Sequence, residues 1–272
     1  MTSPFDFGGR NVFVAGGTSG INLGIAHGFA RAGAKVTVVS RSQDKVDAAV
    51  AALKTHGGEV AGMALDVRDA AKVEEAFKAS AARFGEIDVL ISGAAGNFPA
   101  AAAGLSPNGF KAVVDIDLMG TFHVVRAAFP FLKKPGACVV NITAPQSWLP
   151  MELQVHVCAA KAGVDMVTRV TAMEWGPLGV RVNSVAPGPI ENTEGWNRLA
   201  PTTAAKDVVI ESVPLRRTGT VEMIADACLW LCSPMASYVT GVVLPVDGGW
   251  SLSGAAGLGR DLRKALMGGN AS

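Results

Sequence analysis

The sequence contains little tyrosine, little cysteine and little charge. Its 272 residues include one tyrosine, Tyr238, four cysteines, and charged side chains at 17% of positions. The formal net charge of +1 argues against a surface that binds nucleic acid or an anionic membrane. With a single phenol in the chain, acid–base chemistry by tyrosine would rest on one position. We expect Tyr238 to pack at the turn into the last strand.

The cysteines lack the spacing of a zinc site or of a redox-active pair. They are Cys138, Cys158, Cys228 and Cys232, and no set of histidines and carboxylates accompanies them. Cys228 and Cys232 lie one helical turn apart in an apolar segment, so we expect them in the core and predict no metal site. Reduced thiols are typical of a cytoplasmic protein.

Long apolar runs are also missing. No stretch reaches the roughly 20 residues that a membrane-spanning helix needs, so no membrane association is expected. The N-terminus has no basic segment followed by an apolar one, and the last residues, Gly-Asn-Ala-Ser, are not a peroxisomal targeting signal. These features predict a cytoplasmic location.

What the chain does contain is apolar surface and glycine. Hydrophobic residues make up 49%, the mean hydropathy is +0.32, and there are 32 glycines. This composition supports a sizeable core and excludes intrinsic disorder. No linker or internal repeat divides the sequence, which therefore predicts one domain over residues 1–272.

Short β-branched runs alternate with longer segments of helical period. Strands are predicted at 11–15, 35–40, 59–66, 89–93, 137–143, 181–186 and 242–246. Helices are predicted at 21–32, 43–56, 69–84, 107–132, 155–175 and 221–232. This pattern is typical of an α/β, Rossmann-type, doubly wound parallel sheet of about seven strands flanked by helices. Ligands then bind at the carboxyl ends of the strands.

A glycine-rich turn joins the first strand to the first helix. Between Gly16 and Gly24, backbone N–H groups and the helix dipole could face a pyrophosphate. The alternative is a tight turn with no ligand. The residues predicted to bind the cofactor here are Gly16, Thr18, Ser19, Gly20 and Ile21.

The end of the second strand indicates which dinucleotide binds. An NAD site usually presents a carboxylate there, whereas this chain has Arg41, which could pair with the 2′-phosphate of NADP. The alternative is a solvated arginine. Asp66 and Val67 are expected beside the adenine, although Asp66 could instead cap the helix near Asp69. Small residues around Ala94 would let the backbone pass close to the cofactor.

Several further motifs resemble the short-chain dehydrogenase/reductase family over nearly the whole chain. They are the glycine turn, Asp66-Val67, Lys161-Ala162, Arg181-Val182-Asn183-Ser184-Val185-Ala186-Pro187-Gly188 and Asp247-Gly248-Gly249. The family's catalytic set is Asn, Ser, Tyr and Lys, of which this chain keeps only Lys161. Val157 stands at the tyrosine position, Ala144 at the serine position and Asp117 at the asparagine position.

These losses resemble one branch, the 2,4-dienoyl-CoA reductases of the peroxisomal type, which also lack the tyrosine and the serine. The residues that carry this resemblance include Gly96-Asn97-Phe98, Asp115-Ile116-Asp117, Glu174-Trp175-Gly176-Pro177 and Ala186-Pro187-Gly188-Pro189-Ile190. The chain departs from the usual pattern at Ala15 and Asn22 in the glycine turn and at Ser92-Gly93, where the family has a pair of asparagines.

The resemblance implies NADPH-dependent reduction of 2,4-dienoyl-CoA to 3-enoyl-CoA in unsaturated fatty acid degradation. Asp117 would hold the water that protonates carbon, and Lys161 would bind the nicotinamide ribose. His156 and Asp247 are alternative acids. Further cofactor contacts are expected from Pro187, Gly188 and Ile190, and substrate contacts from Asn97, Phe98 and Thr143.

Two other functions stay open: reduction of another conjugated enone or acyl thioester, and a catalytically silent NADP-binding scaffold. Residues 189–217 contain prolines and no strong strand pattern, so we expect them to form a substrate lid. The helix at 221–232 and the last strand resemble the family's oligomer surface, which implies a homotetramer.

Overall fold

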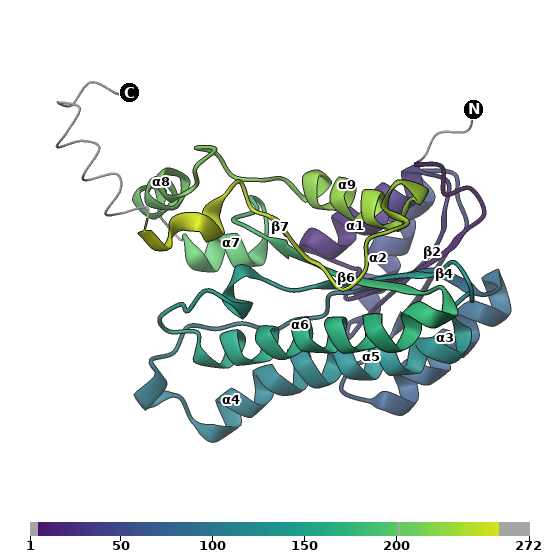
Figure 1. Ribbon diagram of the computed structural model, residues 1–272, viewed down its shortest axis with the longest axis horizontal. Helices are drawn as coiled ribbons and strands as arrows, with labels where there is room; N and C mark the ends of the chain where they lie inside the picture. Colours follow the sequence, from purple (N-terminus) through teal and green to yellow (C-terminus); the bar gives the residue numbers. More distant parts are fainter. Residues whose placement is uncertain (1–4, 201, 256–272) are drawn as a thin grey trace.

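The computed structural model describes residues 5–200 and 202–255, and they form a parallel sheet covered by helices on both faces (Figure 1). The sheet has the order β3-β2-β1-β4-β5-β6-β7, and every neighbouring pair is parallel. The strands are β1 (Asn11–Ala15), β2 (Lys35–Ser40), β3 (Val60–Ala64), β4 (Ile87–Ser92), β5 (Cys138–Ile142), β6 (Arg181–Pro187) and β7 (Val243–Val246). The predicted fold class is confirmed.

Helices cover the sheet in two layers, with α1, α2 and α9 on one face and α3 to α6 on the other (Figure 1). The helices are α1 (Gly20–Arg31), α2 (Gln43–Lys54), α3 (Ala70–Phe84), α4 (Pro107–Val114), α5 (Gly120–Ala128), α6 (Val155–Trp175), α7 (Glu194–Leu199), α8 (Thr203–Ser212) and α9 (Val221–Cys232). Helices α7 and α8 lie beyond the ends of β6 and β7 and leave the sheet faces free (Figure 1).

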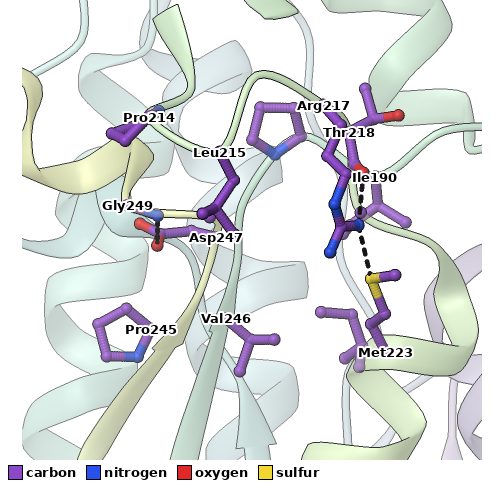
Figure 2. A pocket seen from close by; sticks show the side chains of 14 residues that line it. Ile190, Pro214, Leu215, Arg217, Thr218, Met223, Pro245, Val246, Asp247 and Gly249 are labelled. Atoms are coloured by element: carbon purple, nitrogen blue, oxygen red, sulfur yellow. Dashed lines mark hydrogen bonds between the residues drawn. The ribbon is translucent and has the colours of Figure 1, made fainter.

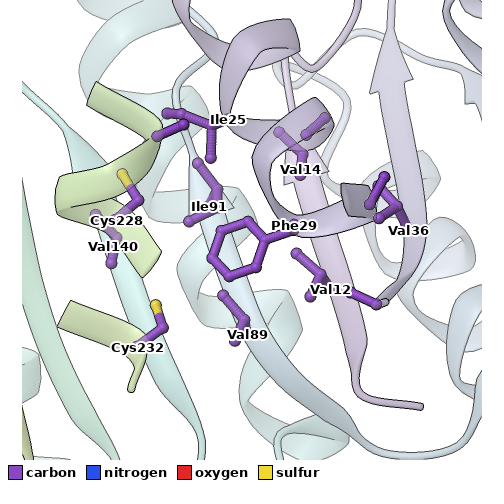
Figure 3. Close-up of a cluster of buried hydrophobic side chains, with 14 of the residues drawn as sticks. Val12, Val14, Ile25, Phe29, Val36, Val89, Ile91, Val140, Cys228 and Cys232 are labelled. Atoms are coloured by element: carbon purple, nitrogen blue, oxygen red, sulfur yellow. The ribbon is translucent and has the colours of Figure 1, made fainter. Parts of the chain in front are cut away.

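The core lies between the sheet and each helix layer. The inner strands β1 and β5, which are covered on both faces, bury every side chain. On the α1 face, Phe29 packs among Val12, Ile91 and other sheet residues, with Cys228 beside them (Figure 3). Cys138, Cys228 and Cys232 are buried and free, as expected for the latter two. Burial raises the pKa of the Cys228 thiol, so it packs as a small apolar group.

The sheet register determines which loops meet. Ala15 at the end of β1 pairs with Val39 of β2 on one side and with Ser92 of β4 on the other. The loops after these three strands therefore leave the sheet at one edge and at the same height. The strand order reverses direction at β1, which is where α/β sheets of this type form a ligand crevice.

Two regions differ from the predicted elements. The helix expected at 107–132 is broken by a π-helical turn at Asp115–Met119, between α4 and α5. The segment 189–217, in which no helix was predicted, contains α7 and α8. Thr193 and Thr202 cap these two helices through their hydroxyls, a signal that the sequence carried.

Tyr238 does not pack as expected. It follows a short 3₁₀ turn after α9 and is fully exposed, at 104% of its reference area. The prediction was therefore wrong for the single chain. No helix in the described part of the chain is long and apolar enough to span a bilayer.

Candidate active site

Two adjoining cavities open at the carboxyl end of the sheet. The first, of about 390 Å³, lies beside the glycine-rich turn and the end of β2, and we call it the cofactor cavity. The second, of about 280 Å³, lies against α6 and the ends of β5 and β6, and we call it the reaction cavity. Ile21, Asn22 and Gly93 belong to the walls of both.

The glycine turn has the backbone that an anion site needs. Gly16 and Gly20 have φ of +77° and +51°, which a side chain would strain. Helix α1 begins at this turn with neither a side-chain cap nor an acidic residue in its first turn. Its first N–H groups are therefore left to bind a phosphate, and the turn fits a dinucleotide pyrophosphate.

At the end of β2, the cofactor cavity is lined by cations. Arg41 and Lys45 both contribute to the wall and both are exposed. The Thr18 hydroxyl donates to Ser40 Oγ at 2.9 Å, which joins the glycine turn to this strand end. The sequence indicated Arg41, whereas Lys45 was missed although it lies in the first turn of the next helix.

Asp66 lines the cofactor cavity, and its carboxylate forms an ion pair with Arg68. Arg68 donates to it from its guanidinium, with Nη2 2.6 Å from Oδ2, and from its backbone N–H at 2.9 Å from Oδ1. These bonds, the side-chain ones first, lower the pKa of the Asp66 carboxyl. Asp69 caps α3 through the N–H of Lys72, so the alternative role of Asp66 as the cap is wrong.

The predicted residues that line the cofactor cavity are Gly16, Thr18, Ser19, Gly20, Ile21, Arg41, Asp66, Val67 and Ala94. Those that line the reaction cavity are Asn97, Asp117, Thr143, Lys161, Pro187, Gly188 and Ile190. The structure thus brings together residues that are spread over most of the chain.

The wall of the reaction cavity contains a buried ion pair. Lys161 Nζ lies 3.1 Å from Asp117 Oδ2, and the two residues are 6% and 1% exposed. Asp117 Oδ1 accepts the Gly96 N–H at 2.7 Å, and Lys161 donates to the Ile142 carbonyl at 3.2 Å. Each charge has an opposite charge and a backbone partner, which is the condition for burying both.

The π-helical turn places Asp117. A π turn adds a residue to the helix, so the residues after it are rotated relative to an uninterrupted α-helix, and such turns are frequent at functional sites. The Thr121 hydroxyl donates to the Asp117 carbonyl oxygen at 2.7 Å and supports this backbone. Asp115, in the same turn, instead forms an exposed ion pair with Lys111.

The walls around this ion pair are apolar where the family has catalytic oxygens. Ala144 and Val157 both line the reaction cavity. The hydroxyl of Thr143 also lines this cavity, and it is buried with no hydrogen-bond partner in the described part of the chain. Trp196, from the predicted lid, also lines the cavity, as do Gln146 and Gln154, which were not among the predicted site residues.

A second buried carboxylate lies one helical turn beyond Lys161. Asp165 is 3% exposed, and its Oδ1 has no hydrogen-bond partner among the described residues. Burial raises the pKa of the Asp165 carboxyl, and the nearby hydroxyls of Ser147 and Thr143 oppose this shift in part. Asp165 therefore differs from Asp117, whose oxygens both have donors.

The structure does not bring His156 or Phe98 to the reaction cavity wall. The His156 ring is fully buried against the Phe98 ring, with 4.7 Å between centroids. Neither ring nitrogen of His156 has a partner in the described part of the chain. The next residue, Val157, lines the cavity, so His156 points to another side of α6.

Asp247 lines a third cavity, of about 530 Å³, together with Pro214, Leu215 and Met223 (Figure 2). Its carboxylate accepts the N–H groups of Gly249 and Ser251, each at 2.8 Å, and so holds the turn after β7. Gly188 passes close to it, because a Cβ at Gly188 would lie 2.6 Å from the Asp247 Cα. A catalytic role for Asp247 stays a prediction.

The chain is similar to known proteins over most of its length. A family model described as Enoyl-(Acyl carrier protein) reductase matches residues 15–251. The peroxisomal 2,4-dienoyl-CoA reductase of Rattus norvegicus, named as (3E)-enoyl-CoA-producing, is 46% identical over 239 residues, which are 87% of this chain and 82% of the relative. That of Saccharomyces cerevisiae is 41% identical over 90% of this chain and 86% of the relative. The resemblance to 2,4-dienoyl-CoA reductases is confirmed.

A bacterial relative carries a related name. The probable 2,4-dienoyl-CoA reductase of Bacillus subtilis, named as (2E)-enoyl-CoA-producing, is 39% identical and covers 88% of this chain and 96% of its own length. Within residues 5–200 and 202–255, no three histidine, cysteine or acidic side chains converge as a metal site would require.

Solved structures agree on the architecture. A putative short-chain alcohol dehydrogenase from Sinorhizobium meliloti superposes with a TM-score of 0.86 at 28% identity, covering 92% of this chain and 100% of that one. The citronellol catabolism dehydrogenase of Pseudomonas aeruginosa superposes with a TM-score of 0.80 at 35% identity, covering 92% and 98%. On its sequence, its fold and the arrangement of its site, the chain belongs to the short-chain dehydrogenase/reductase family.

Proposed function

We propose that the protein reduces 2,4-dienoyl-CoA thioesters to 3-enoyl-CoA with NADPH, in the degradation of unsaturated fatty acids. The observation that carries the proposal is the buried Asp117–Lys161 pair in a cavity where Ala144 and Val157 replace the family's hydroxyl groups. A site without a serine or a tyrosine lacks the donors that an alcohol or ketone reaction needs at the reacting oxygen.

The chemistry of a conjugated thioester suits such a site. A nicotinamide dinucleotide held by the glycine turn and Lys161 would supply a hydride. Addition of that hydride at the far end of the diene would move negative charge to the thioester oxygen. A proton must then reach the α carbon of the resulting dienolate. No alcohol oxygen is formed, so no phenol is needed beside the carbon that accepts the hydride.

The Asp117–Lys161 pair can deliver this proton to the α carbon through a water molecule. Gly96 and Lys161 fix the Asp117 carboxylate, so it can orient a water molecule whose proton moves to the α carbon. The hydroxide left behind is neutralised by the Lys161 ammonium, which regains its proton from solvent. The same ammonium would bind the nicotinamide ribose, since two partners leave one of its three N–H groups available.

Selection of NADP over NAD is supported by the end of β2. Arg41 and Lys45 line the cofactor cavity there, and a guanidinium can pair with the 2′-phosphate through two N–H groups. Asp66, with its charge partnered by Arg68, and Val67 remain the proposed neighbours of the adenine.

Segment 189–217 is proposed as the substrate lid. Pro189, Ile190, Thr193 and Trp196 from this segment line the reaction cavity together with Thr143, which is proposed to contact the thioester. Helices α7 and α8 cover this end of the sheet (Figure 1). Asn97 also lines the cavity and is proposed as a further substrate contact.

A homotetramer in the cytoplasm is proposed as the working form. Large side chains are strongly exposed on α6 and beside α9, notably Met173 at 80%, Met235 at 60% and Tyr238 at 104%. Contact between copies would cover such groups. Light scattering is expected to give four times the 27.9 kDa chain mass. Free thiols fit the cytoplasm, although the named animal and yeast relatives are peroxisomal.

The test is a spectrophotometric assay that follows NADPH oxidation with 2,4-hexadienoyl-CoA. We expect turnover with this substrate and little with a 2-enoyl-CoA or with NADH, and a 3-enoyl-CoA as the product. Turnover only with a simple enone would favour the second reductase function. NADPH binding without turnover on any of these substrates would favour a silent scaffold.

A further inference from the structure

Asn22 and Gly93, two positions where the sequence departs from the family pattern, contact one another. Asn22 lies in the first turn of α1, and Gly93 directly follows β4. Asn22 Nδ2 donates to the Gly93 carbonyl at 2.7 Å. A Cβ at Gly93 would collide with Asn22 Oδ1, so the amide occupies the space that any side chain at 93 would need.

The amide is held from a second side by the glycine turn. A Cβ at Gly16 would lie 3.2 Å from Asn22 Nδ2 and 2.9 Å from the Ala94 backbone. Asn22 is therefore wedged between the loop after β1 and the loop after β4. Its orientation is determined by the Gly93 carbonyl, which can accept only from the amino end of the amide.

The other end of the amide has no partner. Asn22 Oδ1 is buried and makes no hydrogen bond within the described part of the chain. A buried acceptor without a donor is unfavourable, and such atoms in native proteins usually serve a bound molecule or water. Asn22 lines both the cofactor cavity and the reaction cavity, so the free oxygen lies where the two meet.

We propose that Asn22 is a cofactor-binding residue whose Oδ1 accepts a hydrogen bond from the nicotinamide half of NADP(H). This inference rests on the proposed function for the identity of the cofactor. The pyrophosphate has only acceptor oxygens and cannot satisfy Oδ1. The donors on the nicotinamide half are the ribose hydroxyls and the carboxamide amino group, and a fixed acceptor would orient this half against Lys161.

The test measures equilibrium binding of three ligands to wild type and to Asn22→Ala. The ligands are NADPH, 2′-phospho-ADP-ribose, which lacks nicotinamide, and 2′,5′-ADP, which also lacks the second ribose. We expect Asn22→Ala to weaken NADPH about tenfold and 2′,5′-ADP less than about twofold. If Asn22→Ala also weakens binding of 2′-phospho-ADP-ribose, the hydrogen bond is made by the ribose. If it weakens binding of NADPH but not of 2′-phospho-ADP-ribose, the bond is made by the carboxamide.

Equal weakening of all three ligands, or of none, would overturn the proposal. Failure of the wild type to bind NADPH would instead contradict the proposed cofactor. This result differs from those that contradict the role of Asn22, so the two proposals can fail separately. Thermal unfolding of each variant shows whether a loss of binding reflects a loss of folded protein.

A double-mutant cycle tests whether the Asn22 amide occupies the space beside Gly93. Gly93→Ala should weaken NADPH more than Asn22→Gly does, because the new Cβ collides with the amide. The double variant should bind like Asn22→Gly alone, since the collision partner is gone. Gly104→Ala, at a glycine with open space around it, is the matched control. Gly93→Ala could fail to fold. In that case, recovery of folding in the double variant would equally support the collision between residue 93 and the Asn22 amide, and failure to recover would contradict it.

Discussion

The reaction cavity and the cofactor cavity adjoin each other but hold their charges differently. In the reaction cavity, Asp117 and Lys161 are buried and paired at 3.1 Å. In the cofactor cavity, Arg41 and Lys45 are exposed. Buried charges interact strongly and are costly to leave unpaired, whereas exposed charges are screened by water and salt. Chemistry is therefore expected to depend on the first cavity and cofactor preference on the second.

The largest effect is expected from breaking the buried pair. Asp117→Asn keeps the shape of the side chain and removes the charge that orients water. We expect turnover of the dienoyl-CoA to fall about 100- to 1000-fold. NADPH affinity should change less than about threefold, because the residues of the cofactor cavity are unchanged and Lys161 keeps its bond to the Ile142 carbonyl. Steady-state rates and NADPH titration measure the two quantities separately.

The control for this variant is Asp115→Asn, two residues earlier in the same π turn, which removes a carboxylate from an exposed ion pair. Near-normal turnover in Asp117→Asn would contradict the proposed role and favour His156 as the acid. In that event His156→Phe should abolish turnover, whereas the position of His156 away from the cavity wall predicts little effect.

A smaller and more selective effect is expected in the cofactor cavity. Arg41→Ala should weaken NADPH about tenfold, the value of one charged hydrogen-bonded contact to a phosphate, and leave NADH nearly unchanged. The measurement is the ratio of the two dissociation constants at low salt. Lys45→Ala is the matched control, since it removes a positive charge from the same cavity. A smaller loss of NADPH affinity in this variant would show that Arg41 pairs directly with the 2′-phosphate and does not act only as a nearby positive charge. Equal losses for both cofactors in Arg41→Ala would disprove the assignment.

The smallest effect is expected on the reaction side, where Asp165 is buried without the donors that Asp117 has. Because burial raises its pKa in the folded state, folding favours the protonated form. Its contribution to stability is therefore fully present below the unfolded pKa and is lost as pH rises through the folded pKa. Lys161, Arg169 and the Ser147 and Thr143 hydroxyls oppose the shift but do not cancel it.

Asp165→Asn removes this titration. At pH 7 we expect the variant to unfold with a free energy about 1 kcal/mol higher than wild type, with the difference vanishing near pH 3. Denaturant unfolding at both pH values measures it. A variant that is less stable at pH 7 would show that the ionised carboxylate is needed there, for instance by Thr143.

Much of the fold could be read from the sequence because it depends on local pattern. The first two strands and the helices α6 and α9 begin and end where the hydrophobic period predicted. The break in the helix predicted at 107–132 was missed because local pattern does not reveal it. The π turn at Asp115–Met119 lies within a continuous helical period, and its geometry depends on packing against neighbouring elements.

The candidate site divides in the same way. Gly16, Arg41, Asp117 and Lys161 were identified because each lies in a recognisable stretch of sequence, and all four line the two cavities. Lys45 and Asp165 have no such local signal, since an ordinary helix contains many similar residues. Their importance appears only when the loops and helices converge.

The amino-acid sequence was sufficient to establish the type of fold and the inventory of chemical groups. The single tyrosine, together with Ala144 and Val157 at the family's hydroxyl positions, excluded a catalytic phenol and a serine hydroxyl on sequence grounds. The folded arrangement was needed to establish which of the remaining groups meet. Both pairings that the site needs span tens of residues. Asn22 meets Gly93 because β1 and β4 lie in parallel register, and Asp117 meets Lys161 because the π turn packs against α6.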